Sequence, residues 1–150
     1  MRRSSSGISP VVATVILVAI AIVIAIAVAF WASGLVGIFT KFEKIEIRSS
    51  YATATDGSYD VHILTFNSGS SSATIDELYI NGQPAKGLVS ACKPEEVCDG
   101  DPATGVTLKV GASQEIIITI DKKTFSPGVT IEVMVHTASG KQYPTAVLLP

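Results

Sequence analysis

The two cysteines, Cys92 and Cys98, are the residues whose type and spacing allow the most specific chemistry. In an oxidising compartment, a pair this close in sequence favours a disulfide. Closing so short a loop would stabilise the fold by no more than about 2–3 kcal/mol in the chain-entropy model. Two free thiols, or half of a metal site, are the alternatives. Because the sequence has no second Cys/His pair to complete a tetrahedral zinc site, it favours the disulfide and predicts no metal.

The histidines and carboxylates form no catalytic motif. His62 and His136 are isolated and fall inside predicted strands, so each is interpreted as a structural residue. One loop holds four carboxylates that could bind calcium, but without EF-hand spacing a solvated acidic loop explains them better. They are Glu95, Glu96, Asp99 and Asp101. The sequence also lacks a nucleophile motif, a P-loop and a dinucleotide fingerprint. We therefore expect no catalytic residue, no cofactor and no enzyme activity.

The element that dominates the chain is an apolar segment near the N-terminus. Residues 4–40 contain no Asp, Glu, Lys or Arg. An uncharged run longer than about 18 residues is long enough to cross a bilayer as a helix. Large and small apolar residues alternate over residues 19–29, as in a strand, but a lone strand in lipid would leave its backbone groups unpaired. Ser9 as N-cap and Pro10 at the first helical position also predict a helix.

This helix is expected to be longer than a membrane requires. From Pro10 to about Thr40 it would measure about 45 Å, against a hydrocarbon core of about 30 Å. The excess would project beyond the membrane, where Gly34 and Gly37 could kink or loosen the helix. Alanines along the run would let helices approach closely. The segment could therefore be surrounded either by lipid or by other copies of itself.

Residues at the two ends of the apolar segment predict its orientation. Arg2 and Arg3 precede the segment and would stay in the cytoplasm under the positive-inside rule. Phe30 and Trp31 lie at the far end, where amphipathic aromatic residues favour the membrane–water interface. The rest of the chain would then lie outside the cell membrane. A net charge of −2 gives no indication of nucleic-acid binding.

Residues 41–150 predict a β-sandwich head domain. Seven runs of β-branched, mostly alternating residues cover positions 45–48, 59–66, 75–80, 106–110, 115–120, 129–135 and 142–149. Turn clusters separate the runs, and Asn81-Gly82 is the strongest hairpin signal. About seven short strands are typical of an immunoglobulin-like sandwich, although the only tryptophan, Trp31, lies in the apolar segment. The predicted fold class is α+β, with a long hydrophobic helix over residues 8–40 followed by an all-β head.

The N-terminal residues carry a family resemblance. Gly7-Ile8-Ser9-Pro10-Val11-Val12-Ala13-Thr14 follows Arg2-Arg3 and precedes a long Ala/Ile/Val run. This pattern resembles the amino-terminal signature of archaeal type IV pilins, and its Ser-Pro form is closer to adhesive pilins than to archaellins. The resemblance covers about the first 40 residues, and the head shares only the general architecture of an immunoglobulin-like β-sandwich. It implies that residues 1–7 are a class III signal-like leader, which a prepilin peptidase removes between Gly7 and Ile8.

The resemblance also implies a function at the cell surface. The membrane would hold the precursor, and an assembly ATPase and platform would move it into a helical homo-oligomer used for adhesion. The heads would form the surface of this extracellular filament. The helices would form its core, with nine residues expected inside it: Val11, Val12, Val15, Val18, Ile22, Ala25, Ile26, Ala29 and Phe30. Val12 occupies the position where bacterial pilins carry glutamate, so packing would have to set the register.

Three alternatives remain open from the sequence. The first is a monomeric extracellular binding domain held by a single membrane span. The second is an archaellin, the subunit of a motility filament. The third is a secreted enzyme whose signal is cleaved near Trp31, since Ala27 and Ala29 imitate an A-x-A cleavage site. The apolar run is longer than the roughly 7–15 residues of an ordinary signal, which argues against the third.

Overall fold

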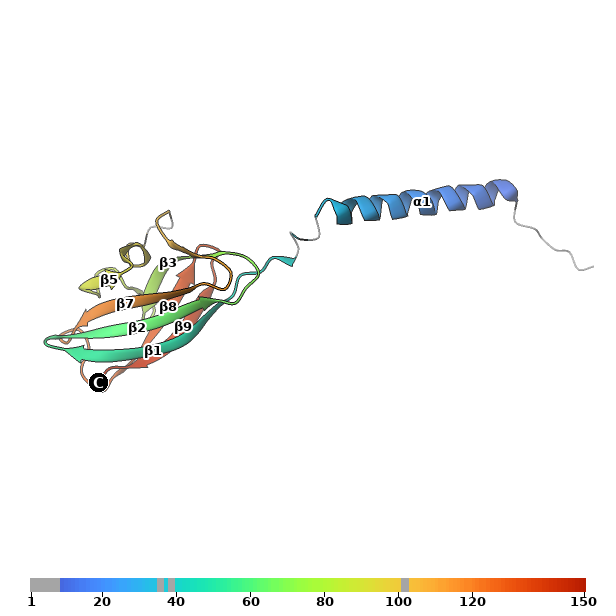
Figure 1. The fold of residues 1–150 in the computed structure, drawn as a ribbon. Coiled ribbons are helices and arrows are strands. Elements are labelled where there is room, and N and C mark those ends of the chain that lie inside the picture. Colours follow the sequence, from blue (N-terminus) through green and yellow to red (C-terminus); the bar gives the residue numbers. More distant parts are fainter. Residues whose placement is uncertain (1–8, 35–36, 38–39, 101–102) are drawn as a thin grey trace, which may run out of the picture. The chain divides into compact units, whose positions relative to one another are not determined.

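The computed structural model describes residues 9–34, 37, 40–100 and 103–150. It divides into two compact units, with the boundary between Lys41 and Phe42 (Figure 1). Over the residues described, the first unit contains the long helix α1, and the second unit contains two antiparallel sheets. The predicted α+β class, with a long apolar helix followed by a β-sheet domain, is therefore confirmed.

The helix α1 spans Pro10–Ala32. Ser9 occupies the N-cap position and Pro10 begins the helix, as expected, but the Ser9 side chain makes no capping hydrogen bond. The helix α1 ends at Ala32, before the predicted Thr40, and the interruption falls at Gly34, one of the two glycines where a kink is expected. Ser33 caps the C-terminus by donating its backbone N–H to Ala29 O at 2.9 Å, and Gly34 then adopts a φ of +72°. A glycine in this left-handed conformation is a common end to a helix.

All seven predicted strands exist in the second unit. They are β1 (Ile45–Thr55), β2 (Ser58–Asn67), β3 (Ala73–Ile80), β6 (Val106–Leu108), β7 (Ser113–Asp121), β8 (Thr130–Thr137) and β9 (Gln142–Leu148). The structure adds β4 (Gln83–Pro84), β5 (Ala91–Lys93) and a short 3₁₀ helix, η1 (Glu95–Val97). The predicted hairpin at Asn81-Gly82 is confirmed, because it joins β3 to β4 with Ile80 opposite Gln83 and with positive φ at both turn residues.

The strands form two antiparallel sheets. One has the order β1-β2-β7-β5, and the other has the order β4-β3-β8-β9 with β6 added to β3. Figure 1 shows β1, β2 and β7 side by side in one layer, while β8 and β9 belong to the other. Along β2 the residues alternate strictly between partly exposed and buried, as expected for a strand with one face on a core. The sheets therefore sandwich a single apolar core.

The core is built from the inward-facing residues of both sheets. Its largest fully buried side chains include Tyr59, Ile63, Ile75, Leu78, Ile116, Ile118 and Ile131. At one edge, β1 approaches β9 from the other sheet, and the hydroxyls of Ser50 and Thr145 lie 2.9 Å apart. This core holds the two sheets together and fixes the positions of the loops at both ends of the head.

Candidate functional site

The first candidate site is the surface of α1. The nine residues predicted for a filament core all lie on this helix, and all of them are exposed: Val11, Val12, Val15, Val18, Ile22, Ala25, Ile26, Ala29 and Phe30. No residue of α1 is buried in the structure. Even the least exposed large side chains, such as Ile16 and Ile26, retain 50% of their accessible surface. So much apolar surface requires a non-aqueous partner.

The apolar surface of α1 surrounds the helix. Consecutive residues such as Ile16, Leu17 and Val18 project about 100° apart, so a run of them leaves no polar face. The hydroxyl of Thr14 donates to Val11 O at 2.8 Å, so this polar group is satisfied within the helix. Within the described residues, α1 is also the single helix long and apolar enough to cross a membrane. The arrangement suits a membrane anchor, a signal segment or the centre of a helix bundle.

The predicted peptidase site, Gly7 and Ile8, lies outside the described residues. The predicted cleavage between Gly7 and Ile8 therefore stays a prediction.

The second candidate site is the loop that holds the cysteines. Cys92 and Cys98 form a disulfide, with their Cα atoms 6.2 Å apart. Cys92 lies on β5, opposite Ile118 of β7, and Cys98 follows η1. Between them, Val97 is fully buried and fixes the loop to the core. The disulfide and the buried valine together hold an irregular segment against the sheet.

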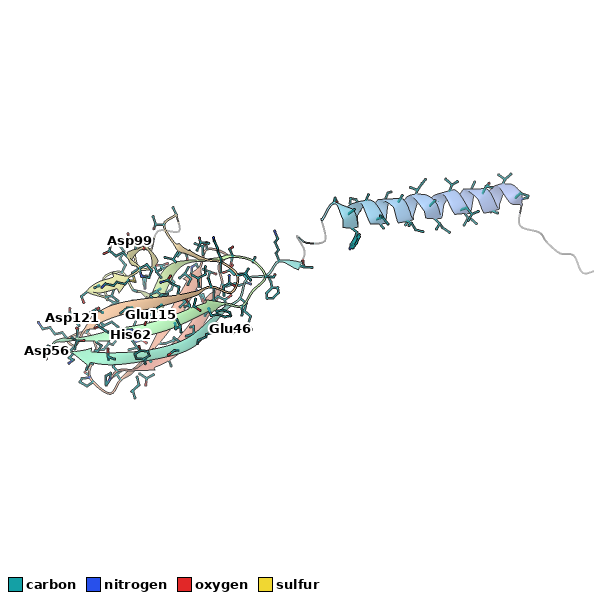
Figure 2. The ribbon with its side chains drawn as sticks, in the orientation of Figure 1. Glu46, Asp56, His62, Asp99, Glu115 and Asp121 are labelled. Carbon is teal, nitrogen blue, oxygen red and sulfur yellow. A yellow bond between two sulfur atoms is a disulfide. The ribbon has the colours of Figure 1, made fainter. Side chains whose placement is uncertain are left out.

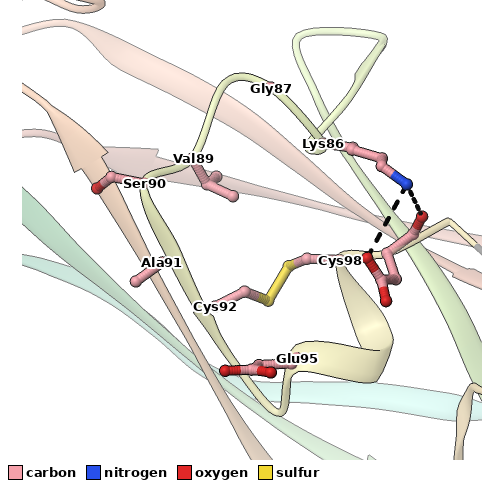
Figure 3. Close-up of a pocket in the computed structure, with 9 residues that line it drawn as sticks. Lys86, Gly87, Val89, Ser90, Ala91, Cys92, Glu95 and Cys98 are labelled. Carbon is pink, nitrogen blue, oxygen red and sulfur yellow. Dashed lines mark hydrogen bonds and ion pairs between the residues drawn. A yellow bond between two sulfur atoms is a disulfide. The ribbon is translucent and has the colours of Figure 1, made fainter.

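A shallow hollow of about 280 Å³ lies beside this disulfide (Figure 3). Lys86 crosses one side of it, donating from Nζ to Asp99 O at 2.9 Å and lying 3.9 Å from Asp99 Oδ1. Glu95 lines the hollow as well, and all three of these side chains are exposed. The Lys86–Asp99 contact closes the disulfide loop back onto the turn after β4, which is a structural role.

The two histidines lie on different sheets, and each has a carboxylate partner. His62 Nδ1 lies 3.0 Å from Glu115 Oε1, and both residues are labelled in Figure 2. The His62 ring stacks on Tyr51 with 4.8 Å between centroids. His136 Nδ1 lies 2.7 Å from Asp76 Oδ1. Across residues 9–34, 37, 40–100 and 103–150, no cluster of three or more His, Cys, Asp or Glu side chains is placed to hold a metal ion.

Two ionisable groups on the head surface have shifted pKa values. The Tyr79 hydroxyl donates to Glu77 Oε2 at 2.7 Å, and this bond raises the pKa of Tyr79. Hydrogen bonding to the Lys44 ammonium at 2.6 Å lowers the pKa of Glu46. Each shift follows from one local hydrogen-bond partner, Glu77 for Tyr79 and Lys44 for Glu46.

A third feature was missed from the sequence: the loops at the end of the head where the chain enters from α1. Asn67 is fully buried there, although its position in an Asn-Ser-Gly-Ser segment indicates only a turn. Its Nδ2 donates to Ser71 O at 2.9 Å and to Leu108 O at 3.0 Å. Its Oδ1 accepts from Gly69 N–H at 2.9 Å. One buried amide thus joins two loops that are distant in sequence.

No protein-family model and no curated protein matches this chain. The function must therefore be inferred from the chemistry of α1 and of the head.

Proposed function

We propose that the chain is the structural subunit of an extracellular filament like a type IV pilus, with α1 packed in the core and the heads on the surface. The observation that carries this proposal is the surface of α1: 23 residues, none charged, apolar on every side and exposed in the single chain. Such a surface can be covered by lipid before assembly and by neighbouring helices afterwards. Adhesion is the role that the resemblance to archaeal pilins supports.

The free energy of burial favours an α1 that is fully shielded from water, both in the membrane and in the filament. Burying one Leu, Ile or Val side chain contributes roughly 1.5–3 kcal/mol relative to water. Transfer from lipid to a helix bundle gains much less, because lipid tails are as apolar as these side chains. Close packing through alanines such as Ala13, Ala21 and Ala25 would then favour the bundle. A subunit with these properties can leave the membrane for the filament without exposing α1 to water.

The remaining steps of the proposal follow from the family resemblance. A prepilin peptidase would cut between Gly7 and Ile8, and an assembly ATPase with its platform would add the subunit to the growing filament. The mature subunit would be found outside the cell, in a helical homo-oligomer.

A second candidate function uses the same helix differently. At 1.5 Å per residue, the 23 residues of α1 measure about 35 Å, which suits a single membrane span. In that case the chain is a monomeric extracellular binding domain on a permanent anchor. The two candidates differ in whether copies of α1 pack on one another.

A pair of alanine-to-aspartate substitutions tests the filament. Ala25→Asp puts a charge in the proposed core, where its desolvation costs several kcal/mol. Ala54→Asp makes the same change at an exposed position of β1 in the head. We expect electron microscopy of surface preparations to reveal filaments of the Ala54 variant and none of the Ala25 variant. Normal filaments from both variants would exclude α1 as the core.

A further inference from the structure

We propose that one end of the head, which we call the base, lies against an anionic lipid surface while α1 spans the membrane. The base comprises residues 42–48, 65–72, 109–114 and 137–142, at the end of the sandwich where Glu46 is labelled in Figure 2. This inference rests on the part of the proposed function that puts α1 in a membrane before assembly. It does not require that a filament forms.

The backbone of the first residues of the head is fixed by hydrogen bonds to the other loops of the base. Phe42 N–H donates to Ser70 Oγ, and Ser70 N–H donates back to Phe42 O, both at 2.9 Å. Ser68 N–H donates to Lys44 O at 2.9 Å. From a different loop, Lys141 Nζ donates to Glu43 O at 2.7 Å. The chain therefore enters the head at a fixed place.

Close packing leaves little freedom at this entry point. A Cβ added to Gly69 would lie 2.6 Å from Phe42 O and 2.7 Å from Lys44 N. Only nine residues separate Ala32, the last residue of α1, from Phe42. Fully extended, nine residues span at most about 32 Å. When α1 is in a membrane, this short tether makes the base the part of the head that is attached nearest to the lipid.

The surface of the base carries exposed apolar side chains and lysines, the two kinds of residue that bind an anionic lipid surface. Phe42 and Val110 expose 53% and 54% of their surfaces, although both are large apolar residues. The base also carries three exposed lysines: Lys44 on the entering segment, Lys109 before the turn into β7, and Lys141 before β9. Lys44 Nζ is paired with Glu46 Oε1 and Lys141 Nζ donates to Glu43 O, so Lys109 is the lysine on which the charge-reversal test below is placed. An aromatic side chain with neighbouring lysines can insert between headgroups while the ammonium groups contact phosphates.

Formal charge is segregated between the base and the rest of the head. The base holds four basic and two acidic residues, for a net charge of +2. The rest of residues 42–150 holds four basic and eleven acidic residues, for a net charge of −7. Figure 2 labels two of these acidic residues, Asp56 and Asp121, at the opposite end of the sandwich. An anionic surface would attract the base and repel the remainder, so this charge distribution favours one orientation of the head.

A tryptophan probe at position 42 tests the contact in the full chain. The probe variant carries Trp31→Phe and Phe42→Trp, so that its fluorescence comes from the base alone. It is reconstituted in vesicles of phosphatidylcholine, or of phosphatidylcholine and phosphatidylglycerol in equal amounts, with brominated tails as quencher. We expect at least twofold greater quenching in the anionic vesicles, reversed by 1 M salt.

Charge-reversal variants make the test specific. Lys109→Glu changes the base and should reduce the quenching at position 42 at least twofold in anionic vesicles. Lys93→Glu changes the net charge equally, but on β5 outside the base, and should leave the quenching unchanged. Equal effects of the two substitutions, or equal quenching in both kinds of vesicle, would overturn the proposal. Quenching that falls as protein is crowded in the vesicle would assign the base to a second copy instead, and would also overturn it.

Experiments on the unmodified chain distinguish a base that does not contact lipid from an α1 that does not insert in the membrane. Its native Trp31 reports on α1, because it is 73% exposed at the end of that helix. Quenching of Trp31 without quenching at position 42 would refute the lipid contact of the base while leaving α1 in the membrane. Without quenching of Trp31, the membrane-anchored precursor itself would be refuted.

Discussion

Replacing Asn67 by alanine should destabilise the head more than any surface substitution. Asn67 has no exposed surface, and its side chain makes three hydrogen bonds of 2.9–3.0 Å. Two of them reach the carbonyls of Ser71 and Leu108, and the third comes from the N–H of Gly69. Alanine leaves these partners without the amide.

The expected loss follows from how buried these partners are. The bonds to Leu108 and from Gly69 are themselves buried, while the bond to Ser71 is partly buried. A buried polar group left unpaired costs about 1–3 kcal/mol. Two such groups therefore give a loss of about 2–6 kcal/mol, while water can replace part of the bond to Ser71.

Urea unfolding of the full chain in detergent, followed by circular dichroism of the β-sheet signal, measures this loss. The matched control is Gln142→Ala, which removes an exposed amide at the same end of the head and should change the free energy of unfolding by less than about 0.5 kcal/mol. The slope against urea should be the same for all three proteins, since the surface exposed on unfolding does not change. If Asn67→Ala were as stable as the control, Asn67 would not be what joins these loops.

Three further predictions concern the head. Reduction of the disulfide should lower the free energy of unfolding by about 2 kcal/mol, measured by thermal unfolding with and without reductant. Gly105→Ala should destabilise the head more than Gly87→Ala, because an added Cβ at position 105 would lie 2.5 Å from the backbone oxygen of Ile75. At position 87 the Cβ would meet no neighbouring atom, and the cost is only the backbone strain of a φ of +90°. Equal melting temperatures for these two variants would contradict that packing. Glu77→Gln should lower the pKa of Tyr79, measured by the ultraviolet absorbance of tyrosinate. Because the pKa of Tyr79 is raised in the folded state, the Tyr79–Glu77 hydrogen bond stabilises the fold below about pH 10, and this stabilisation is lost as the pH rises through the folded pKa.

Alternation of apolar and polar residues was sufficient to predict the seven principal strands. It failed for β4 and β5, which have two and three residues and show no alternating run. Pro84 also argues against a strand, but β4 is an edge strand, where the missing N–H is tolerated. The Asn81-Gly82 turn places β4 beside β3. Backbone pairing with β7, in which Cys92 lies opposite Ile118, holds β5 in register.

Composition alone identified α1 but misjudged its end. The absence of charge continues to Thr40, so hydropathy gives no stop at Ala32. The stop comes from backbone geometry, namely the C-cap at Ser33 and the positive φ of Gly34. The sequence does contain the signal, since a Ser-Gly pair after an apolar run is a helix terminator.

The base could not be predicted from the sequence because its parts are far apart along the chain. Lys44, Lys109 and Lys141 look like isolated surface lysines until the fold brings their loops to one end. Asn67 resembles an ordinary turn residue, and only the structure reveals its burial. Surfaces assembled from loops depend on the topology of the two sheets, which local patterns do not encode.

The most direct test of the central claim is electron microscopy of surface appendages purified from cells that produce the full chain, with mass spectrometry of the subunit. The filament proposal predicts threads made of this chain, with mature subunits that begin at Ile8. Single copies of the chain that stay in membrane vesicles, with no threads in any preparation, would contradict it.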